Sequence, residues 1–471
     1  MNDTGLVATH SLRERFSAAM SAMYRAEVPA YGTLLELVER INDQRLQNDP
    51  ELAAELDATA GRARLASERH GAIRVGRAEE LATLRRFFAV LGMFPVGYYD
   101  LSVAGVPVHA TAFRPLEPHA LAANPFRLFT SLLRLDLIDD AGLRAEAEAI
   151  LGRRRIFSNE ALRLLRQAEA DGGLAPDAAD AFVAALRETF RWHGTASVDS
   201  ATYDRLYASH PVVADVVSFP VPHINHLTPR TLDIDAAQAA MPDYGIAPKA
   251  VVEGPPPRRC PILLRQTAFK ALEEPVAFPE AGGGYAAGRH RARFGEIEQR
   301  GAALTAAGRA RYDACLAAAR AAVAPAPDGS NAQAYTGALE SAFADFPDDW
   351  ETLRAEGLAY FQYSVTPAGE QAPPLDRLDS GIETLIEQGL VRADPIVYED
   401  FLPVSAAGIF QSNLGDRSGP AIAAEANRQA FEAALGARPD DELALYASRE
   451  ARSIDRCLER FAPDAPREGS A

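Results

Sequence analysis

Apolar residues recur at three- and four-residue intervals over most of the first ninety positions of the chain. This spacing places them on one face of a helix, and it predicts helices at 11–28, 31–48, 50–68 and 78–92. Residues 1–93 are therefore expected to form a helical N-terminal part.

The period changes at Phe94, where apolar residues begin to alternate with small or polar ones. Alternation between glycine and proline breaks is typical of strands, and it predicts them at 95–102 and 106–115. The apolar stretch at 126–138 predicts a further strand, with a helix as the alternative.

Helical spacing returns at Asp140, and residues 140–210 are expected to form a helical insertion with a break at two consecutive glycines. Further strands are expected in four stretches, at 212–220, 249–254, 260–272 and 292–301. Further helices are expected at five places, near 303–323, 331–344, 377–389, 421–436 and 440–461.

Strands in the middle of the chain with helical blocks on both sides predict the α+β fold class and one continuous core. We interpret residues 1–471 as a single domain, in which 94–415 form a mixed core and 416–471 form C-terminal helices. The sequence shows no internal repeat of 20–50 residues, so a solenoid or propeller is not expected.

Composition and charge limit the possible partners. The chain has 471 residues, of which 48% are hydrophobic and 24% charged, as in ordinary globular proteins. Its formal net charge of −17 gives no general attraction to phosphate backbones or anionic lipids, so neither nucleic acid nor a membrane is expected as a partner. Three scattered cysteines and the lack of an apolar signal segment predict a cytoplasmic protein.

The chain has nine histidines, and three of them lie in suggestive surroundings. His70 precedes Arg74 by four residues, a separation that places both side chains on one face of a helix or a strand. His223 and His226 lie between two prolines that disfavour a helix, and in a strand only one of them could enter a metal site. For each histidine the alternative is a structural role.

Glu296 and Glu298 share one face of a predicted strand. A buried carboxylate is costly unless it is paired or bound to a metal; the alternative is a solvent-facing edge on which Glu298 pairs with Arg300. Two imidazoles and one carboxylate form the ligand set of a non-haem iron(II) site, although zinc and manganese also use it. An arginine nearby would offer two N–H groups to a substrate carboxylate.

Three other patterns receive a structural interpretation. The glycines at 282–284 lack the lysine and the serine or threonine of a phosphate-binding loop. The proline-rich segment 254–259 is typical of a stiff turn, and the basic run at 288–294 is expected to be solvated.

Six long stretches combine uncommon residues in a distinctive order. They are HGAIRVG (70–76), VGYYDLSVAGVPVHATAFRP (96–115), ADVVSFPVPHINHLTPRTLDID (214–235), KAVVEGPPPRRCPILLRQTAFKAL (249–272), RFGEIEQRGAALT (293–305) and VYEDFLPVSAAGIFQSNLG (397–415). Together they resemble the 2-oxoadipate dioxygenase/decarboxylase family, whose bacterial members are hydroxyglutarate synthases of lysine catabolism. The resemblance extends from about Ser11 to Arg460.

The resemblance implies a fold similar to that of the vicinal-oxygen-chelate enzymes, with a metal-holding sheet wrapped by helices. It implies Fe(2+) as the cofactor, with His70, His226 and Glu296 as its ligands. The catalytic arginine of the family corresponds to Arg74, and the substrate-binding residues correspond to His70, Arg74, Val404 and Ser405.

The resemblance also implies the reaction. 2-Oxoadipate and O2 would give (R)-2-hydroxyglutarate and CO2 by oxidative decarboxylation and hydroxylation of the same molecule. We expect a monomer, with an oligomer left open, and a variable loop at 281–288. Two alternatives remain: a redox-inert isomerase or hydrolase using zinc or manganese on the same ligands, and a non-catalytic binding or scaffold protein.

Overall fold

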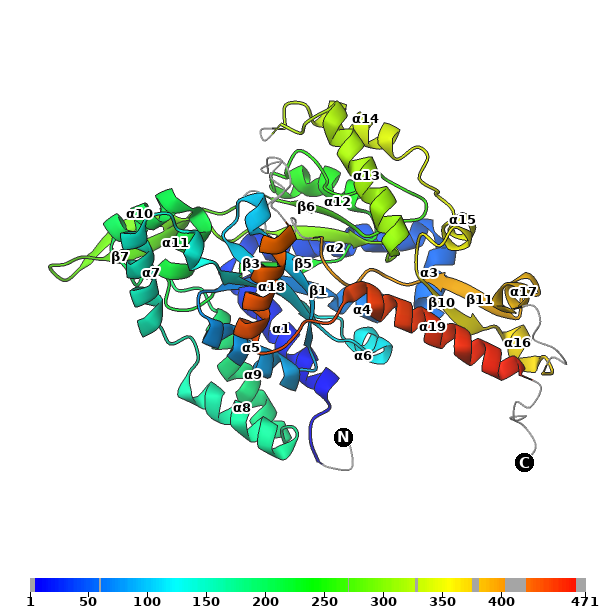
Figure 1. Ribbon diagram of the computed structural model, residues 1–471, viewed down its shortest axis with the longest axis horizontal. Coiled ribbons are helices and arrows are strands. Elements are labelled where there is room, and N and C mark those ends of the chain that lie inside the picture. Colours follow the sequence, from blue (N-terminus) through cyan, green and yellow to red (C-terminus); the bar gives the residue numbers. More distant parts are fainter. Residues whose placement is uncertain are drawn as a thin grey trace.

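The computed structural model describes residues 5–58, 61–269, 271–326, 329–374, 381–402 and 421–462. Helices and strands are mixed along this part of the chain, and a five-stranded sheet lies near the middle of the molecule (Figure 1). The expected α+β class is therefore confirmed.

The five-stranded sheet has the strand order β2-β3-β4-β1-β5. β1 pairs with β4 in parallel and with β5 in antiparallel orientation, so the first strand lies inside the sheet. The N-terminal part is thus not purely helical, because β1 falls within it. The strands predicted at 95–102, 106–115 and 126–138 are confirmed, and the helical alternative for the third range is wrong. The strands are β1 (Arg69–Val75), β2 (Phe94–Asp100), β3 (Val108–Arg114), β4 (Arg127–Leu133) and β5 (His226–Pro229).

Helices cover one face of this sheet. Ile73 and Val75 of β1 pack there against apolar side chains of α1, α2, α5, α8 and α9. The alternate residues of β1, at 70, 72 and 74, therefore point to the opposite face. The first helices are α1 (Thr9–Glu27), α2 (Pro29–Asn48), α3 (Pro50–Ala58), α4 (Gly61–Ser67), α5 (Ala78–Val90) and α6 (Pro118–Ala123).

The stretch 140–210 is helical as expected, and helices continue beyond its predicted end. The strand predicted at 212–220 is wrong, because this segment is helix α11. Pro211 occupies its first turn, and the side chain of His210 accepts a hydrogen bond from the backbone N–H of Val212. Since every residue from Val212 to Ser218 is buried, this helix shows no polar face and its sequence reads like a buried strand. The helices are α7 (Ala141–Arg153), α8 (Asn159–Asp171), α9 (Pro176–Arg187), α10 (Ser200–Ser209) and α11 (Pro211–Ser218).

Two strand pairs follow in the chain. β6 (Leu264–Ala268) pairs with β9 (Glu296–Arg300), within the stretches predicted as strands. β7 (Glu274–Pro279) pairs with β8 (Tyr285–His290), so the stretch expected to be a variable loop instead contains most of a strand. The predicted strand at 249–254 is wrong, since this segment makes only isolated bridges.

The basic run at 288–294 is only partly solvated: Arg289 and Arg291 are exposed as expected, whereas His290 and Arg293 are not. His290 and Arg293 are almost fully buried, and Arg293 forms ion pairs with Glu274 and Glu27. Partners distant in sequence compensate the buried charge, which the local pattern of basic residues does not reveal.

The helices predicted near 303–323, 331–344, 377–389, 421–436 and 440–461 are confirmed, although the first residues of the third lie outside the described residues. Three short helices at 234–240, 350–355 and 367–371 and two strands at 361–365 and 391–395 were not predicted. α19 lies beside the pair of β10 and β11 (Figure 1). These elements are α12 (Ile234–Ala240), α13 (Ala306–Ala322), α14 (Ala332–Ala342), α15 (Trp350–Ala355), β10 (Phe361–Val365), α16 (Pro367–Gln371), α17 (Gly381–Glu387), β11 (Val391–Pro395), α18 (Ala421–Leu435) and α19 (Glu442–Phe461).

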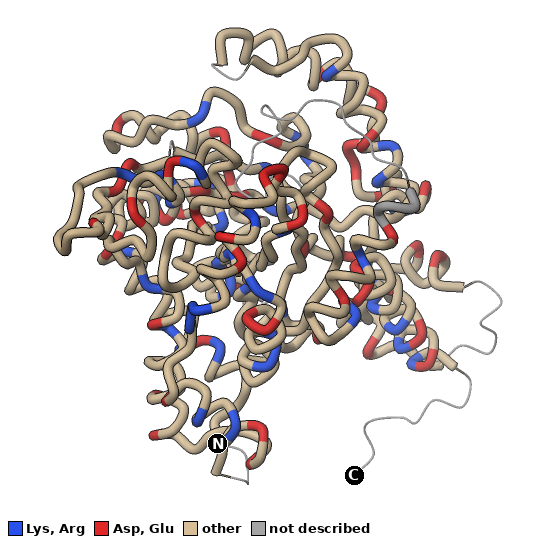
Figure 2. The backbone as a smooth tube through the Cα atoms, turned by 60° about the vertical axis from the view of Figure 1, so that its left-hand side comes forward, with Lys and Arg blue, Asp and Glu red and all other residues tan. Residues whose placement is uncertain are grey.

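Buried apolar side chains form three large clusters and not the single continuous core that was expected. One lies under the N-terminal helices, one between the sheet and α7, α10 and α11, and one among the C-terminal elements. Acidic and basic residues are interspersed over the molecule (Figure 2). Among the described helices, none has both the length and the apolar character needed to cross a bilayer.

Candidate metal site and its surroundings

The register of β1 and β5 brings two histidines to one face of the sheet. His70 is paired with Thr228, and Ala72 with His226. Residues paired across two strands point to the same side, as do alternate residues of one strand. His70, Ala72, His226 and Thr228 therefore share the sheet face away from the N-terminal helices.

Glu296, the first residue of β9, completes the group. One ligand atom each from His70, His226 and Glu296 lies within 4.8 Å of the other two. All three side chains are almost fully buried. Nε2 of His70 is 3.1 Å from Oε1 of Glu296, and the two imidazole rings have their centroids 5.3 Å apart.

The orientation of His226 is set by a hydroxyl group. The Thr228 hydroxyl donates to Oε1 of Glu296 at 3.0 Å, so its oxygen accepts from Nδ1 of His226 at 2.9 Å. With the proton on Nδ1, the lone pair of His226 is on Nε2. The amide of Gln266 also donates to Oε1 of Glu296, at 3.0 Å.

Two atoms of this group fit a metal ion. Nε2 of His226 and Oε2 of Glu296 are buried without a hydrogen-bond partner among the described residues. Buried polar atoms are nearly always paired, so two unpartnered atoms in a group whose ligand atoms lie within 4.8 Å of one another call for a bound species. Imidazole and carboxylate ligands suit a divalent transition metal, and the donor set therefore fits the group that the resemblance implies.

The pKa values of His226 and Glu296 favour ligation, whereas that of His70 favours a proton that a metal would have to displace. Burial lowers the pKa of His226 to about 4, which keeps its imidazole neutral. Burial alone would raise the pKa of Glu296, but the neighbouring imidazoles of His226 and His70 hold it below its usual range. For His70, the carboxylates of Glu298 and Glu296 outweigh burial and raise the pKa.

Glu298 supports His70 from the other side of the ring. Its Oε2 lies 3.1 Å from Nδ1 of His70, an ion-pair contact between two fully buried groups. Burial would raise the pKa of Glu298, but Arg300 and then His70 lower it to about 2. The solvent-facing edge considered for Glu298 is therefore wrong, although its pairing with Arg300, at 2.7 Å, is confirmed.

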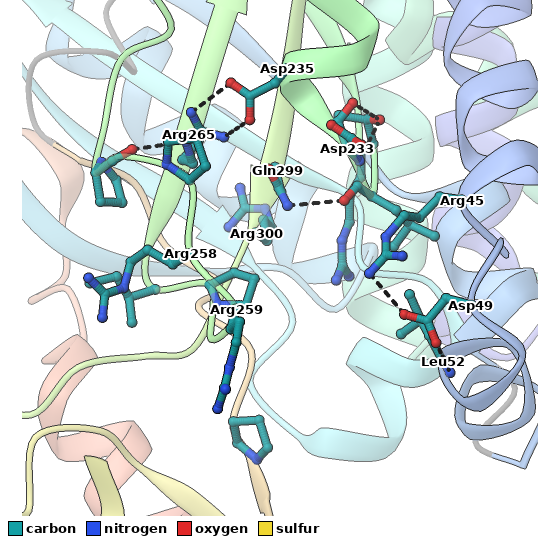
Figure 3. Close-up of a pocket in the computed structure, with 18 of the residues that line it drawn as sticks. Arg45, Asp49, Leu52, Asp233, Asp235, Arg258, Arg259, Arg265, Gln299 and Arg300 are labelled. Carbon is teal, nitrogen blue, oxygen red and sulfur yellow. Dashed lines mark hydrogen bonds and ion pairs between the residues drawn. The ribbon is translucent and has the colours of Figure 1, made fainter. Parts of the chain in front are cut away.

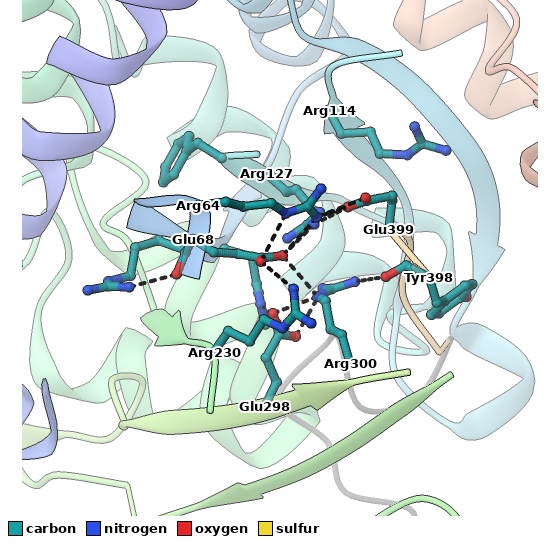
Figure 4. Close-up of polar contacts among 12 residues, drawn as sticks. Arg64, Glu68, Arg114, Arg127, Arg230, Glu298, Arg300, Tyr398 and Glu399 are labelled. Carbon is teal, nitrogen blue, oxygen red and sulfur yellow. Dashed lines mark hydrogen bonds and ion pairs between the residues drawn. The ribbon is translucent and has the colours of Figure 1, made fainter. Parts of the chain in front are cut away.

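The pair of Glu298 and Arg300 belongs to a buried set of charges that we call the Arg/Glu network (Figure 4). Within it, Arg127 bonds to both Glu68 and Glu399. The network connects α4, β4 and β9 with Glu68 before β1, Arg230 after β5 and the segment that follows β11. Its members are Arg64, Arg127, Arg230, Arg300, Glu68, Glu298 and Glu399.

Arg74 lies on the same sheet face as His70, as its spacing predicts. Its Nη1 donates to Oδ2 of Asp215 on α11 at 2.7 Å. The side chain of Arg74 is 12% exposed and that of Asp215 is 6% exposed. The predicted substrate contacts Val404 and Ser405 lie outside the described residues.

Comparison with known proteins adds the family. The family model for 2-oxoadipate dioxygenase/decarboxylase matches residues 16–413. The chain belongs to the 2-oxoadipate dioxygenase/decarboxylase family. The Pseudomonas putida enzyme of that name is 57% identical over 453 residues, covering 96% of this chain and 97% of its own. The Escherichia coli enzyme is 53% identical over 451 residues, covering 96% and 98%.

Solved structures agree with this assignment. The hydroxyglutarate synthase of Pseudomonas putida, in complex with 2-oxoadipate, superposes with a TM-score of 0.90 at 55% identity. The match covers 98% of this chain and 100% of the other. This member of the 2-oxoadipate dioxygenase/decarboxylase family is therefore an enzyme with the same fold, and the scaffold alternative is not supported.

A large cavity of this family member lies apart from the candidate ligands (Figure 3). It has a volume of about 790 Å³, and His70, His226 and Glu296 do not line it. The proline-rich segment forms one wall, and most of the arginines around it are paired, as Arg265 is with Asp235 and Arg45 with Asp49. Paired arginines do not mark a substrate site, so the cavity carries no functional assignment.

Sequence reasoning missed several supporting residues of this 2-oxoadipate dioxygenase/decarboxylase family member. Thr228 could have been found, because it follows His226 by two residues and must share its face of a strand. Gln266 and Asp215 reach the site from other elements, so no local spacing indicates their roles. His223 joins Asp215 and His290 in a separate cluster, in keeping with the expectation that only one of the paired histidines enters the metal site.

Proposed function

We propose that this chain converts 2-oxoadipate and O2 into 2-hydroxyglutarate and CO2, with iron(II) held by His70, His226 and Glu296. The observation that carries the proposal is the convergence of three buried ligand atoms within 4.8 Å, in a chain 55% identical to a synthase solved with 2-oxoadipate. The atoms balance: six carbons enter and leave, and both oxygen atoms of O2 are found in the products.

Iron(II) in this position would supply the activation of O2, since three protein ligands leave coordination positions open. The protein residues would orient the substrate and exclude water. Arg74 would bind a substrate carboxylate by charge-assisted hydrogen bonds. Phe401 packs against the His70 ring with centroids 4.9 Å apart and against the Phe129 ring with centroids 5.4 Å apart. The two phenylalanines would form an apolar wall that keeps water from the site.

The proposal extends to the setting of the enzyme. All three cysteines are free thiols, which is the usual state in a reducing compartment. We therefore propose that the enzyme is cytoplasmic. As the resemblance implies, it would act in lysine catabolism, and its expected state is a monomer, with an oligomer left open.

The test is a reaction of defined composition. Protein loaded with iron(II) under argon is mixed with 2-oxoadipate and then with oxygenated buffer. We expect one O2 consumed and one CO2 released for each 2-hydroxyglutarate formed, as measured by an oxygen electrode and mass spectrometry. Turnover of 2-oxoadipate by zinc-loaded protein without oxygen uptake would favour the redox-inert alternative.

A further inference from the structure

A second cluster of titratable side chains adjoins the candidate active site. Oδ1 of Asp215 accepts a hydrogen bond from Nε2 of His290 at 3.0 Å, and Nε2 of His223 lies 3.1 Å from the same oxygen. The other oxygen, Oδ2, accepts from Nη1 of Arg74 at 2.7 Å. Asp215 and both histidines are buried, at 6%, 4% and 1% exposure.

The rings that hold Oδ1 are themselves fixed. The Tyr203 hydroxyl is 2.9 Å from Nδ1 of His290, which leaves Nε2 of that ring for Asp215. Trp192 stacks on His290 with an interplanar angle of 9° and meets His223 edge-on. The position of the carboxylate is therefore determined by a packed aromatic surrounding.

Two histidines and a carboxylate also resemble a metal site, but the surroundings argue against a second cation. The guanidinium of Arg74 already occupies Oδ2, and it would lie beside any divalent ion bound at Oδ1. Like charges at such separations in a buried site repel strongly. The cluster therefore fits the guanidinium better than it fits a metal.

The pattern of bonds around Asp215 has a geometric consequence. A carboxylate with two available oxygens commonly accepts two hydrogen bonds from one arginine, as Asp400 does from Arg114 at 2.6 and 2.9 Å. Because the imidazoles hold Oδ1, Asp215 meets Arg74 through Oδ2. Asp215 therefore anchors the guanidinium of Arg74 at Nη1 alone and does not form a two-bond, bidentate pair with it.

We propose that Asp215, held by His223 and His290, is a positioning residue that aims Arg74 at the substrate carboxylate remote from the metal. This inference rests on the proposed function. His70 and Arg74 lie four residues apart on one strand, about 13 Å between their Cα atoms, and the small Ala72 lies between them. A fixed guanidinium sets the span from the metal to the distant carboxylate, and so selects dicarboxylic 2-oxo acids of one length.

The test is a double-mutant cycle on substrate affinity. Iron(II)-loaded protein is titrated anaerobically with 2-oxoadipate in a calorimeter, for the wild type, Asp215→Asn, Arg74→Gln and the double variant. We expect each single substitution to weaken binding by about tenfold, and the double variant to bind within about twofold of Arg74→Gln. Adipate serves as a second probe, because it has both carboxylates at the same chain length but no 2-oxo group.

A matched control is the pair of Glu80 and Arg154, which is as buried as the pair of Asp215 and Arg74 and also touches α11. Glu80→Gln should leave the dissociation constant within about twofold of the wild type, because Arg154 does not face the substrate. Thermal unfolding and iron content are measured for every variant.

The outcomes separate the two proposals. If Arg74→Gln binds 2-oxoadipate as tightly as the wild type, Arg74 does not hold the substrate and the proposed site is wrong. A second outcome is that Arg74→Gln binds 2-oxoadipate weakly while Asp215→Asn weakens the binding by the same factor in the wild type and in the Arg74→Gln background. In that case only the positioning role of Asp215 fails. Tighter binding by Asp215→Asn, or loss of a second metal equivalent, would also overturn that role.

A second variant covers the case in which Asp215→Asn does not fold. His290→Phe keeps a ring among Trp192, Tyr203 and Phe219 but removes the N–H that holds Oδ1. With only the His223 contact left at Oδ1, Asp215 would be freer to turn both oxygens onto Arg74. We expect binding weakened by about threefold or more, only while Arg74 is present. Unchanged affinity in a folded His290→Phe protein would contradict the proposal.

Discussion

At the scale of single residues, the candidate ligands are oriented before any metal binds. Thr228 fixes the tautomer of His226, and Glu298 lies against the back of the His70 ring. Such supporting contacts align the donor atoms and raise the basicity of the ligands. The site is therefore a preformed one, and its parts can be tested separately.

The ligand assignment predicts the effect of removing one donor. His226→Ala or Glu296→Ala should lower iron retention and turnover by more than about 100-fold, since even supporting residues of metal sites are worth 10–100-fold. Iron per chain and oxygen uptake measure this. His109→Ala is the control, because His109 is a buried histidine of the same sheet that packs on Phe431 instead. Retention of iron by either ligand variant would remove that residue from the site.

The contact between Glu298 and His70 predicts a weaker effect. Glu298→Gln should lower iron affinity by about 10–100-fold without removing the site, because His70 loses its charged support. Competition with a chromogenic chelator measures the affinity. Glu399→Gln breaks the same Arg/Glu network without touching His70, so an equal loss in both variants would show that the network, and not the contact, is responsible.

The raised pKa of His70 predicts a pH dependence of metal stabilisation. In the metal-free protein its proton stabilises the fold fully below the unfolded pKa of about 6.5, and this contribution is lost as pH rises through the folded pKa. Iron must displace that proton, so its affinity rises by up to about tenfold per pH unit below the folded pKa. The difference in unfolding temperature between iron-loaded and metal-free protein should therefore widen as pH increases from about 6.5. A difference that is constant or narrows would contradict the role of His70.

At the scale of elements, β9 carries three functions on one face. Its alternate residues are a candidate ligand, the support of His70, and the partner of that support: Glu296, Glu298 and Arg300. A small displacement of this strand would therefore disturb both the metal site and the Arg/Glu network.

Gly301, the residue after β9, tests this dependence. A Cβ atom at Gly301 would lie 2.2 Å from the carbonyl carbon of Pro261 and 2.3 Å from the nitrogen of Ile262. Because backbone atoms cannot move aside, Gly301→Ala should cost about 3 kcal/mol of stability and weaken iron binding. Gly337→Ala is the control: it lies in helix α14 with open space around it, and it should stabilise by up to about 1 kcal/mol. Denaturant unfolding measures both, and equal effects would refute the steric argument.

Helices and strands were predictable from the sequence where the spacing of apolar residues fitted only one of the two. The alternation of β2 and β3 and the amphipathic helices were found, whereas the fully buried α11 was taken for a strand because it has no polar face. The residue types of the candidate site were also apparent from the sequence. Their supporting partners were not, since contacts such as that of Arg74 with Asp215 join segments 141 residues apart.

At the scale of the molecule, the candidate metal would link strands from distant parts of the chain. His70, His226 and Glu296 come from β1, β5 and β9, which belong to two different sheets. A ligand that binds only the folded state adds stability in proportion to the logarithm of its concentration over its dissociation constant. The metal should therefore stabilise the whole fold and not only its own site.

Metal removal tests this expectation. At iron(II) concentrations about 1,000 times the dissociation constant, the free energy of unfolding should exceed that of the chelated protein by about 4 kcal/mol. Calorimetry under argon, with and without a chelator, measures the change. His226→Ala should show no such metal-dependent change, and an equal change in that variant would place the stabilising metal elsewhere.

The Arg/Glu network also restricts which substitutions this sequence can accept during evolution. A single replacement within it leaves an opposite charge stranded where water cannot hydrate it, at a cost of about 3–5 kcal/mol. Exposed pairs such as that of Arg163 and Glu160 can lose one member at little cost. Neutral change at the seven network positions therefore has to proceed by concerted exchange of partners, so natural variants should alter these residues together or leave them all unaltered.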